Sequence, residues 1–184
     1  MKRIKYNSPV VLTFALISLA VLGLNKITGG WTNAHFFSVY RSSLASLYTY
    51  PRFFLYVLGH GSWTHFISNM LLILVVGPPL EEKLGSRKLL IAIAITAFAG
   101  GIVQFVLFPG YALLGASGIV FMMIIMSSFA GSKKGTIPLT LIVVFVLYLG
   151  GELVDAVTRQ DSVSQLTHII GGICGAVMGF VMKK

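Results

Sequence analysis

The sequence predicts an all-α membrane protein in which six helices cross the bilayer, on two observations. The chain has 184 residues, of which 56% are hydrophobic and 10% charged, and its mean hydropathy of +0.88 lies above the usual range of soluble domains. A spanning helix needs about 20 mostly apolar residues, and six segments approach that length: 9–27, 61–80, 88–108, 113–130, 136–151 and 165–182. They use most of the chain, so we expect a single domain over residues 1–184.

The basic residues predict the orientation of this bundle. The net charge of +9 also suits a nucleic-acid partner, but the positions of the charges argue for topology. Six spans place ten basic residues on one side: Lys2, Arg3, Lys5, Lys83, Arg87, Lys88, Lys133, Lys134, Lys183 and Lys184. The other side has Lys26, Arg41, Arg52 and Arg159. This is the positive-inside bias, so we expect both termini in the cytoplasm and no nucleic-acid partner.

The first segment, 9–27, follows a basic tail, so a cleaved signal peptide is an alternative to a span. Its apolar run is longer than a usual signal core and no clear small-x-small cleavage site follows it, which favours a retained span. Residues 28–60 connect it to the second span. They are aromatic and sparsely charged, which suits a loop at the membrane interface.

The later connections fit the same topology. "GPPLEEKLGSRK", residues 77–88, contains two prolines and several charges, which predicts the end of the second span and a cytoplasmic turn. "GSKKG", residues 131–135, is a short cytoplasmic link. "GGELVDAVTRQDSVSQ", residues 150–165, contains three of the five acids and belongs outside. The single cysteine, Cys174, lies within the last span, so no intramolecular disulfide can form.

Several polar residues stand out within the spans. His65 and Asn69 are four residues apart near the start of the second span, which places them on one helix face. Ser117 lies between Gly115 and Gly118 near the start of the fourth span. The simplest structural reading is hydrogen bonding between helices for the first pair and close helix packing for the serine. Ionisable groups inside a membrane are nevertheless candidates for function.

The sixth span adds His168, which is followed by Gly171, Gly175 and Gly179 along one helix face. Such a stripe of small residues is typical of a seam between two helices. If the fourth span packs on this stripe, Ser117 faces His168. The polar residues of the three spans then lie at one level, near the external side.

These residue types suit acyl transfer. A neutral imidazole can take the proton of a serine hydroxyl and so make it a nucleophile, which predicts a dyad of Ser117 and His168. The oxyanion that forms needs donors fixed in advance, and the Asn69 amide, the His65 ring N–H and the Ser117 backbone N–H can supply them.

No acidic residue accompanies the dyad within a span. Glu152 and Asp155 lie close to the external boundary and read as loop residues, so we expect no acidic third member. No span shows His, Cys, Asp or Glu at the spacing of metal ligands. We therefore expect neither a metal nor a cofactor.

Together these motifs resemble those of the rhomboid intramembrane serine proteases, over essentially the whole chain. The matching motifs are a His-x-x-x-Asn pair, a Gly-x-Ser-Gly motif and a His followed by glycines: His65 and Asn69; Gly115, Ser117 and Gly118; His168, Gly171 and Gly175. The stretch "EEKLGSRKL", residues 81–89, resembles the acid-x-x-Leu-Gly turn of the family. Each motif is weak alone, but all of them in this order are specific.

The resemblance implies a rhomboid-like bundle of six helices, with Ser117 as the nucleophile and His168 as the general base. The residues implied to stabilise the oxyanion and the substrate are His65, Asn69, Gly115 and Gly118. The residues implied to support the site are His60, Phe121, Gly171 and Gly175. The family's cavity opens to the external side, and its substrates are transmembrane proteins in the lipid bilayer, cut in or near their spans.

Two departures from the family pattern stand out. Many members have a Trp-Arg pair in the first loop, whereas this chain reads "YPRFF", so that Pro51 precedes the matching Arg52. Four residues after the serine the family often has a tyrosine that stacks on the catalytic histidine. Phe121 can stack there but cannot donate a hydrogen bond, so we expect a looser His168 and a lower rate.

Two alternatives to proteolysis follow. A catalytically inactive rhomboid-like protein binds transmembrane helices without cutting them, but it would be expected to lack Ser117 or His168, and both are present. A small transporter also lines its path with polar groups, but nothing here resembles an inverted repeat or a coupling-ion site. By family analogy, the short chain suggests an integral protein of a prokaryotic inner membrane.

Overall fold

The structure is a computed structural model that describes residues 6–130, 139, 142, 143, 146 and 162–182. Those residues form helices and one isolated β-bridge. Three helices are long and apolar enough to cross a membrane: α1 (Pro9–Ile27), α4 (Trp63–Leu84) and α5 (Ser86–Leu107). Two further apolar helices are α6 (Ser117–Ala130) and α8 (Ser162–Val181). Six spans remain a prediction, because the segment 136–151 lies outside the described residues except at four positions.

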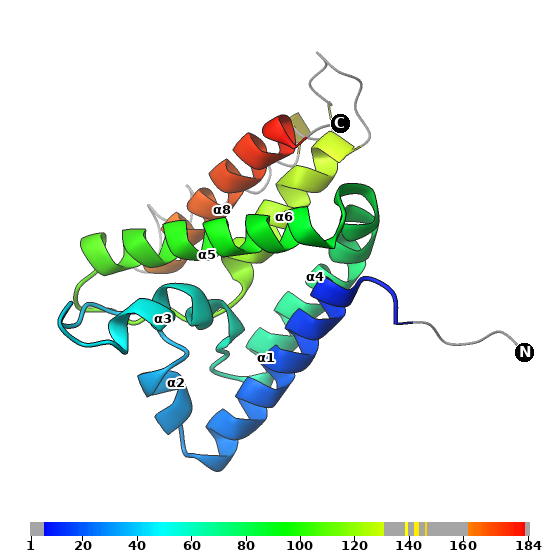
Figure 1. Ribbon diagram of the computed structural model, residues 1–184. Helices are drawn as coiled ribbons and strands as arrows, with labels where there is room; N and C mark the ends of the chain where they lie inside the picture. The colour runs from blue at the N-terminus through cyan, green and yellow to red at the C-terminus, as the bar shows by residue number, and fades with distance from the viewer. Residues whose placement is uncertain (1–5, 131–138, 140–141, 144–145, 147–161, 183–184) are drawn as a thin grey trace, which may run out of the picture.

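The helices form a bundle with α5 packed against the others. Figure 1 shows α6 and α8 side by side, α5 across them, and α1 alongside α4. The connection from α1 to α4 contains three short helices: α2 (Trp31–His35), α3 (Thr49–Leu55) and the 3-10 helix η1 (Tyr56–Leu58). Of these, α3 packs on α5 and α2 on α1. The predicted interfacial loop is therefore a partly helical segment that reaches the bundle.

The N-terminus of α1 is capped by a side chain of α4. The Glu81 carboxylate accepts hydrogen bonds from the backbone N–H groups of Val10 and Val11, each at 3.0 Å, and from the Ser86 hydroxyl at 2.7 Å. Glu81 is only 3% exposed. A buried carboxylate needs such partners, and the first amides of a helix have none within the helix. Both requirements are satisfied by the same contact.

The expectation that Pro78 and Pro79 end the second span is wrong. Helix α4 continues through both prolines to Leu84, and Gly85, at φ +84°, makes the turn into α5. Proline removes a helical hydrogen bond and crowds the preceding turn, but neighbouring helices can compensate for this within a membrane bundle. Here the continued helix brings Glu81 to the start of α1.

Helices α6 and α8 approach each other closely along the predicted glycine stripe. A Cβ on Gly171 would collide with the backbone of Gly118, and a Cβ on Gly175 would lie 2.5 Å from the Met122 carbonyl oxygen. Further along, a Cβ on Gly179 would lie 2.6 Å from the Phe129 ring. Only glycine allows backbones this close, so the stripe is the seam that its spacing predicts.

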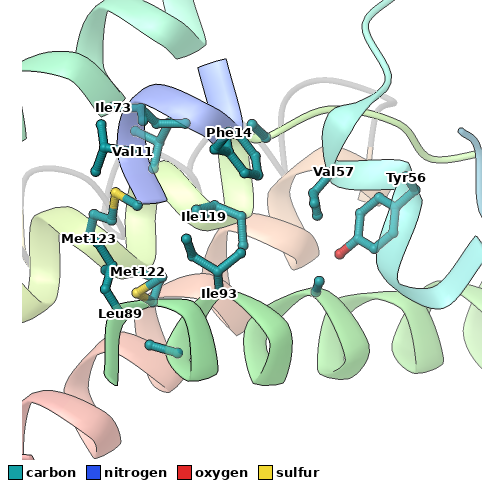
Figure 2. Packing of buried hydrophobic residues seen from close by; sticks show 14 of the residues in the cluster. Val11, Phe14, Tyr56, Val57, Ile73, Leu89, Ile93, Ile119, Met122 and Met123 are labelled. Carbon is teal, nitrogen blue, oxygen red and sulfur yellow. The ribbon is translucent and has the colours of Figure 1, made fainter. Parts of the chain in front are cut away.

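The core lies where α1, α4, α5 and α6 meet. Figure 2 shows buried side chains from all four helices pointing into it, among them Val11, Ile73, Ile93, Ile119 and Met123. These side chains belong to one continuous cluster. This packing fixes the position of α6, whose first residue is Ser117.

Candidate active site

Ser117 begins α6 and is half-buried. The chain that leads to it is held at two points by the segment between α1 and α4. Leu113 and Val39 exchange both backbone hydrogen bonds, each at 2.9 Å, in the isolated bridge. The Gly115 N–H then donates to the Tyr56 carbonyl oxygen at 3.0 Å. Because of these bonds, the backbone before Ser117 is set by tertiary contacts.

The absence of a side chain at Gly115 leaves room for the His65 ring. Its φ of +126° is one that residues other than glycine rarely adopt. A Cβ at this position would lie 2.6 Å from His65 Cε1 and 2.7 Å from Nε2. The imidazole of His65 therefore lies directly against Gly115, two residues before Ser117.

His168 on α8 stacks on Phe121 of α6, with ring centroids 4.4 Å apart and planes at 9°. Phe121 is four residues after Ser117, so both lie on one face of α6. The seam between Gly118 and Gly171 lies beside this stack. The expected stacking of Phe121 on the histidine is present, and it places His168 next to the first turn of α6.

The predicted pair of His65 and Asn69 on α4 lies on the same side of the bundle as Ser117 and His168. His65 of α4 lies against Gly115, and Gly118 of α6 packs on Gly171 of α8, which brings the three helices together at one site. The Ser62 hydroxyl caps α4 by accepting the His65 N–H at 3.1 Å. Asn69 follows one turn after His65 and is 6% exposed.

His60 connects Asn69 to the segment before α4. Its Nδ1 lies 3.1 Å from the Leu58 carbonyl oxygen, which can only accept, so Nδ1 is protonated and donates. Nε2 is then the acceptor for the Asn69 amide N–H at 3.3 Å. The His60 ring also meets the His65 ring edge to face, with centroids 5.1 Å apart. One neutral imidazole thus contacts both members of the pair.

The surroundings of His60 favour its neutral form. The residue is fully buried and lies before the first residue of α4. Burial lowers the pKa of His60 to about 4, and the nearby His65 acts in the same direction. The Asn69 hydrogen bond, which needs an unprotonated Nε2, is therefore stable at neutral pH.

Two residues support the site through hydrogen bonds that the sequence does not predict. The Asn33 amide donates to the His60 carbonyl oxygen at 3.0 Å. Arg52 is buried, donates to the His35 carbonyl oxygen at 2.8 Å and lies 4.4 Å from the centre of the Tyr40 ring. Arg52 therefore packs firmly although Pro51 precedes it. Hydrogen bonds to backbone oxygens depend on the fold, so only the structure reveals them.

The remaining sequence predictions concern acidic residues and metal ligands. Glu152 and Asp155 lie outside the described residues. Within the part of the chain that the structure describes, no three His, Cys, Asp or Glu side chains gather in a way that could hold a metal ion.

Comparison with known proteins relates this arrangement to one family. The model of the rhomboid domain matches residues 48–184. The chain is 29% identical over 176 residues to Rhomboid protease GlpG of Serratia proteamaculans (strain 568), a match covering 94% of this chain and 62% of that protein.

Two further relatives match a smaller share of this chain. Rhomboid-related protein 1 of Caenorhabditis elegans is 30% identical over 146 residues, which cover 71% of this chain and 39% of that protein. Rhomboid-like protein 11, chloroplastic, of Arabidopsis thaliana is 25% identical over 171 residues, which cover 82% and 60%. The chain thus spans less than two thirds of the length of each of the three relatives.

Proposed function

Because this chain belongs to the rhomboid family, we propose that it is an intramembrane serine endopeptidase that hydrolyses peptide bonds in or near the spans of other membrane proteins. The family match and the apolar helices make it an integral membrane protein. The observation that best supports the activity is the stack of Phe121 on His168. It holds an imidazole beside the first turn of α6, where Ser117 lies.

In the proposed reaction, Ser117 Oγ attacks the carbonyl carbon of the scissile bond while the His168 imidazole takes the hydroxyl proton. As the C–N bond breaks, His168 gives this proton to the leaving amine. A water molecule then attacks the ester on Ser117, with His168 again accepting a proton. The carboxylic product leaves and the serine hydroxyl is restored.

The developing oxyanion is proposed to be held by His65, Asn69 and the backbone N–H of Ser117. The Asn69 amide has two N–H groups, and one is bound to His60, which fixes the direction of the other. The Ser117 N–H is in the first turn of α6, where amides have no partner within the helix. Donors fixed before the reaction need no reorganisation, which is the main requirement for stabilising this charge.

The direct test is cleavage of a single-span substrate in proteoliposomes. We expect product from the wild type and roughly a thousandfold less, or none, from Ser117→Ala and from His168→Ala. Ser128→Ala is the matched control, because Ser128 lies on the same helix and its hydroxyl only bonds back to the Ile124 carbonyl oxygen. It should cleave like the wild type.

Other results would contradict the proposal. Equal cleavage by all variants would mean that a contaminant or another residue cuts the substrate. No cleavage by any of them, together with retained binding of the substrate, would favour a rhomboid-like protein that binds transmembrane helices without cutting them.

The proposed substrates are single-span proteins cut near the external end of the span. Peptide hydrolysis requires an extended backbone, and glycine or other helix-breaking residues make a span easier to unwind. Replacing the glycines around the mapped cleavage site with leucine should therefore slow cleavage at least severalfold. A substrate cut at the same rate after these replacements would rule out this preference.

A further inference from the structure

We propose that the groove between α1 and α5 binds one anionic phospholipid of the leaflet next to the basic end of the bundle. The groove has a volume of about 560 Å³ and is lined by side chains of α1, α3, η1 and α5. Three of them, Phe14, Val57 and Ile93, are visible in Figure 2. This binding is independent of the proposed proteolysis, because it involves neither Ser117 nor His168.

The lining of the groove suits a hydrocarbon chain. Nearly all of its side chains are apolar, and the exceptions are Thr13 and Ser86. In an integral membrane protein, such a groove opens toward lipid, where no water is present to fill it. An acyl chain is the apolar occupant that the bilayer itself supplies.

The length of the groove corresponds to one leaflet. Along α5 the lining runs from Ser86 to Ala97, about 17 Å at about 1.5 Å per residue. Half of a hydrocarbon core of about 30 Å is about 15 Å. Toward the end marked by Ala97, the lining includes Phe54, which stacks on Phe98. A single acyl chain therefore fits, whereas a helix that crosses both leaflets is longer than the groove.

The open end lies at the membrane surface. Tyr6 is largely exposed and its hydroxyl lies 2.9 Å from that of Thr13, one of the residues that line the groove. Tyrosine is typical of the boundary between lipid and water. The groove thus begins at the headgroup level and runs inward.

The charge at this end favours an anionic headgroup. Arg87 follows Ser86 directly and is exposed. Further basic residues lie close in sequence to Pro9 and Ser86, where the lining begins on α1 and on α5: Lys2, Arg3, Lys5, Lys83 and Lys88. Among the described residues near this end, Glu82 is the one exposed acid, because the Glu81 side chain of α4 is buried against the N-terminus of α1. Basic clusters beside a span attract anionic lipids.

The test uses phosphatidylglycerol with a photoreactive group in the middle of one acyl chain, in phosphatidylcholine liposomes. Phosphatidylcholine with the same labelled chain is the comparison. After illumination, cross-linked residues are mapped by mass spectrometry. We expect phosphatidylglycerol to label residues 9–17 and 86–97 on the groove side at least about fivefold more than phosphatidylcholine.

Three variants make the test specific. Ala94→Trp fills the groove and should reduce this labelling at least about fivefold, whereas Ile91→Trp, on the exposed face of α5 outside the groove, should leave it unchanged. Arg87→Gln, at an exposed position that should not affect folding, should reduce phosphatidylglycerol labelling to the phosphatidylcholine level. Equal labelling by both lipids, labelling that Ala94→Trp does not change in a folded protein, or cross-links to a second copy of the chain instead would overturn the proposal.

Discussion

At the residue scale, the site depends on a few atoms in fixed places rather than on many polar groups. Gly115 illustrates this best. Its N–H is bound to Tyr56, its φ is positive, and the missing Cβ leaves the space that the His65 ring occupies. The glycine of the Gly-x-Ser-Gly motif is thus required by backbone conformation and by space at once.

We therefore expect Gly115→Ala to reduce proteolysis strongly and to lower the free energy of unfolding by about 1–3 kcal/mol, because the methyl group strains the backbone and displaces His65. Gly110→Ala is the matched control in the same connection, since no atom lies within 4 Å of its added Cβ. Cleavage rates and thermal unfolding of both variants in the same detergent provide the measurement. If Gly115→Ala behaved like Gly110→Ala, the contact with His65 would not be needed.

A second residue-scale prediction concerns pH. His60 has a pKa of about 4 in the folded protein against about 6.5 in the unfolded chain, so the unfolded chain binds more protons between these values. The contribution of neutral His60 to stability is therefore complete above pH 6.5 and is lost as the pH falls toward 4. At about 1.4 kcal/mol per pKa unit, the loss is at most about 3.5 kcal/mol.

Thermal unfolding of the wild type and of His60→Gln between pH 7.5 and about 4 measures this effect. The variant should be less stable at pH 7.5, because it lacks the ring that bridges Leu58 and Asn69, and its stability should depend less on pH over this range. Parallel curves for the two proteins would show that other groups cause the pH dependence.

At the element scale, the spans were more predictable than the contacts between them. Long apolar runs determine where helices lie, so the predicted segment 9–27 coincides with α1, and 88–108 differs from α5 by no more than two residues at either end. The glycine spacing on α8 predicted its seam with α6. By contrast, the bond from Gly115 to Tyr56 joins two backbone atoms 59 residues apart, and no side-chain pattern reports it.

The two prolines of α4 show the limit of local rules. Proline weakens a helix locally, yet α4 continues through both prolines and Glu81 beyond them hydrogen-bonds to the start of α1. A local pattern in the sequence does not show hydrogen bonds between distant elements. The family motif around Glu81 was recognised from the sequence as a turn. The structure has that turn at Gly85, while the residues before it form the last turn of α4, where Glu81 caps another helix.

This contact leads to a prediction for Glu81→Gln. The amide can accept through one oxygen only and has no charge, so at least one of the bonds to Val10, Val11 and Ser86 is lost. Hydrogen bonds to charged groups contribute about 1.5–3 kcal/mol each, and we expect a loss of about that size in the free energy of unfolding. The neighbouring Glu82→Gln, at an exposed position, should change stability by less than about 0.5 kcal/mol.

At the scale of the whole molecule, the site lies where three helices meet and the segment between α1 and α4 supports it from one side. This segment supplies the carbonyl oxygens of Tyr56 and Leu58, which bind Gly115 and His60 respectively. Leu58 also lines the proposed lipid groove, together with its neighbours Phe54 and Val57. The positions of the candidate site residues thus depend on how this segment packs on α5, which neither the serine nor the histidine motif reveals.

The orientation of the molecule in the membrane is the last prediction. Because ten basic residues lie in the segments predicted to be cytoplasmic and four in the others, the positive-inside rule places 131–135 inside and 150–165 outside, with the segment 136–151 crossing between them. We propose to replace Cys174 with serine and to introduce single cysteines as Ser132→Cys and Gln160→Cys.

A maleimide that cannot cross the membrane, added to intact cells, should label Gln160→Cys at once and Ser132→Cys only after permeabilisation. Both variants must first be shown to insert in the membrane, so that an unlabelled cysteine reflects its side and not a loss of protein. Labelling of both from outside, or of neither, would mean that the segment between them does not cross as one span, because two sites separated by a single span cannot face the same side. Since α6 and α8 flank this segment in the chain, that outcome would also contradict a site with Ser117 and His168 at one level near the external surface.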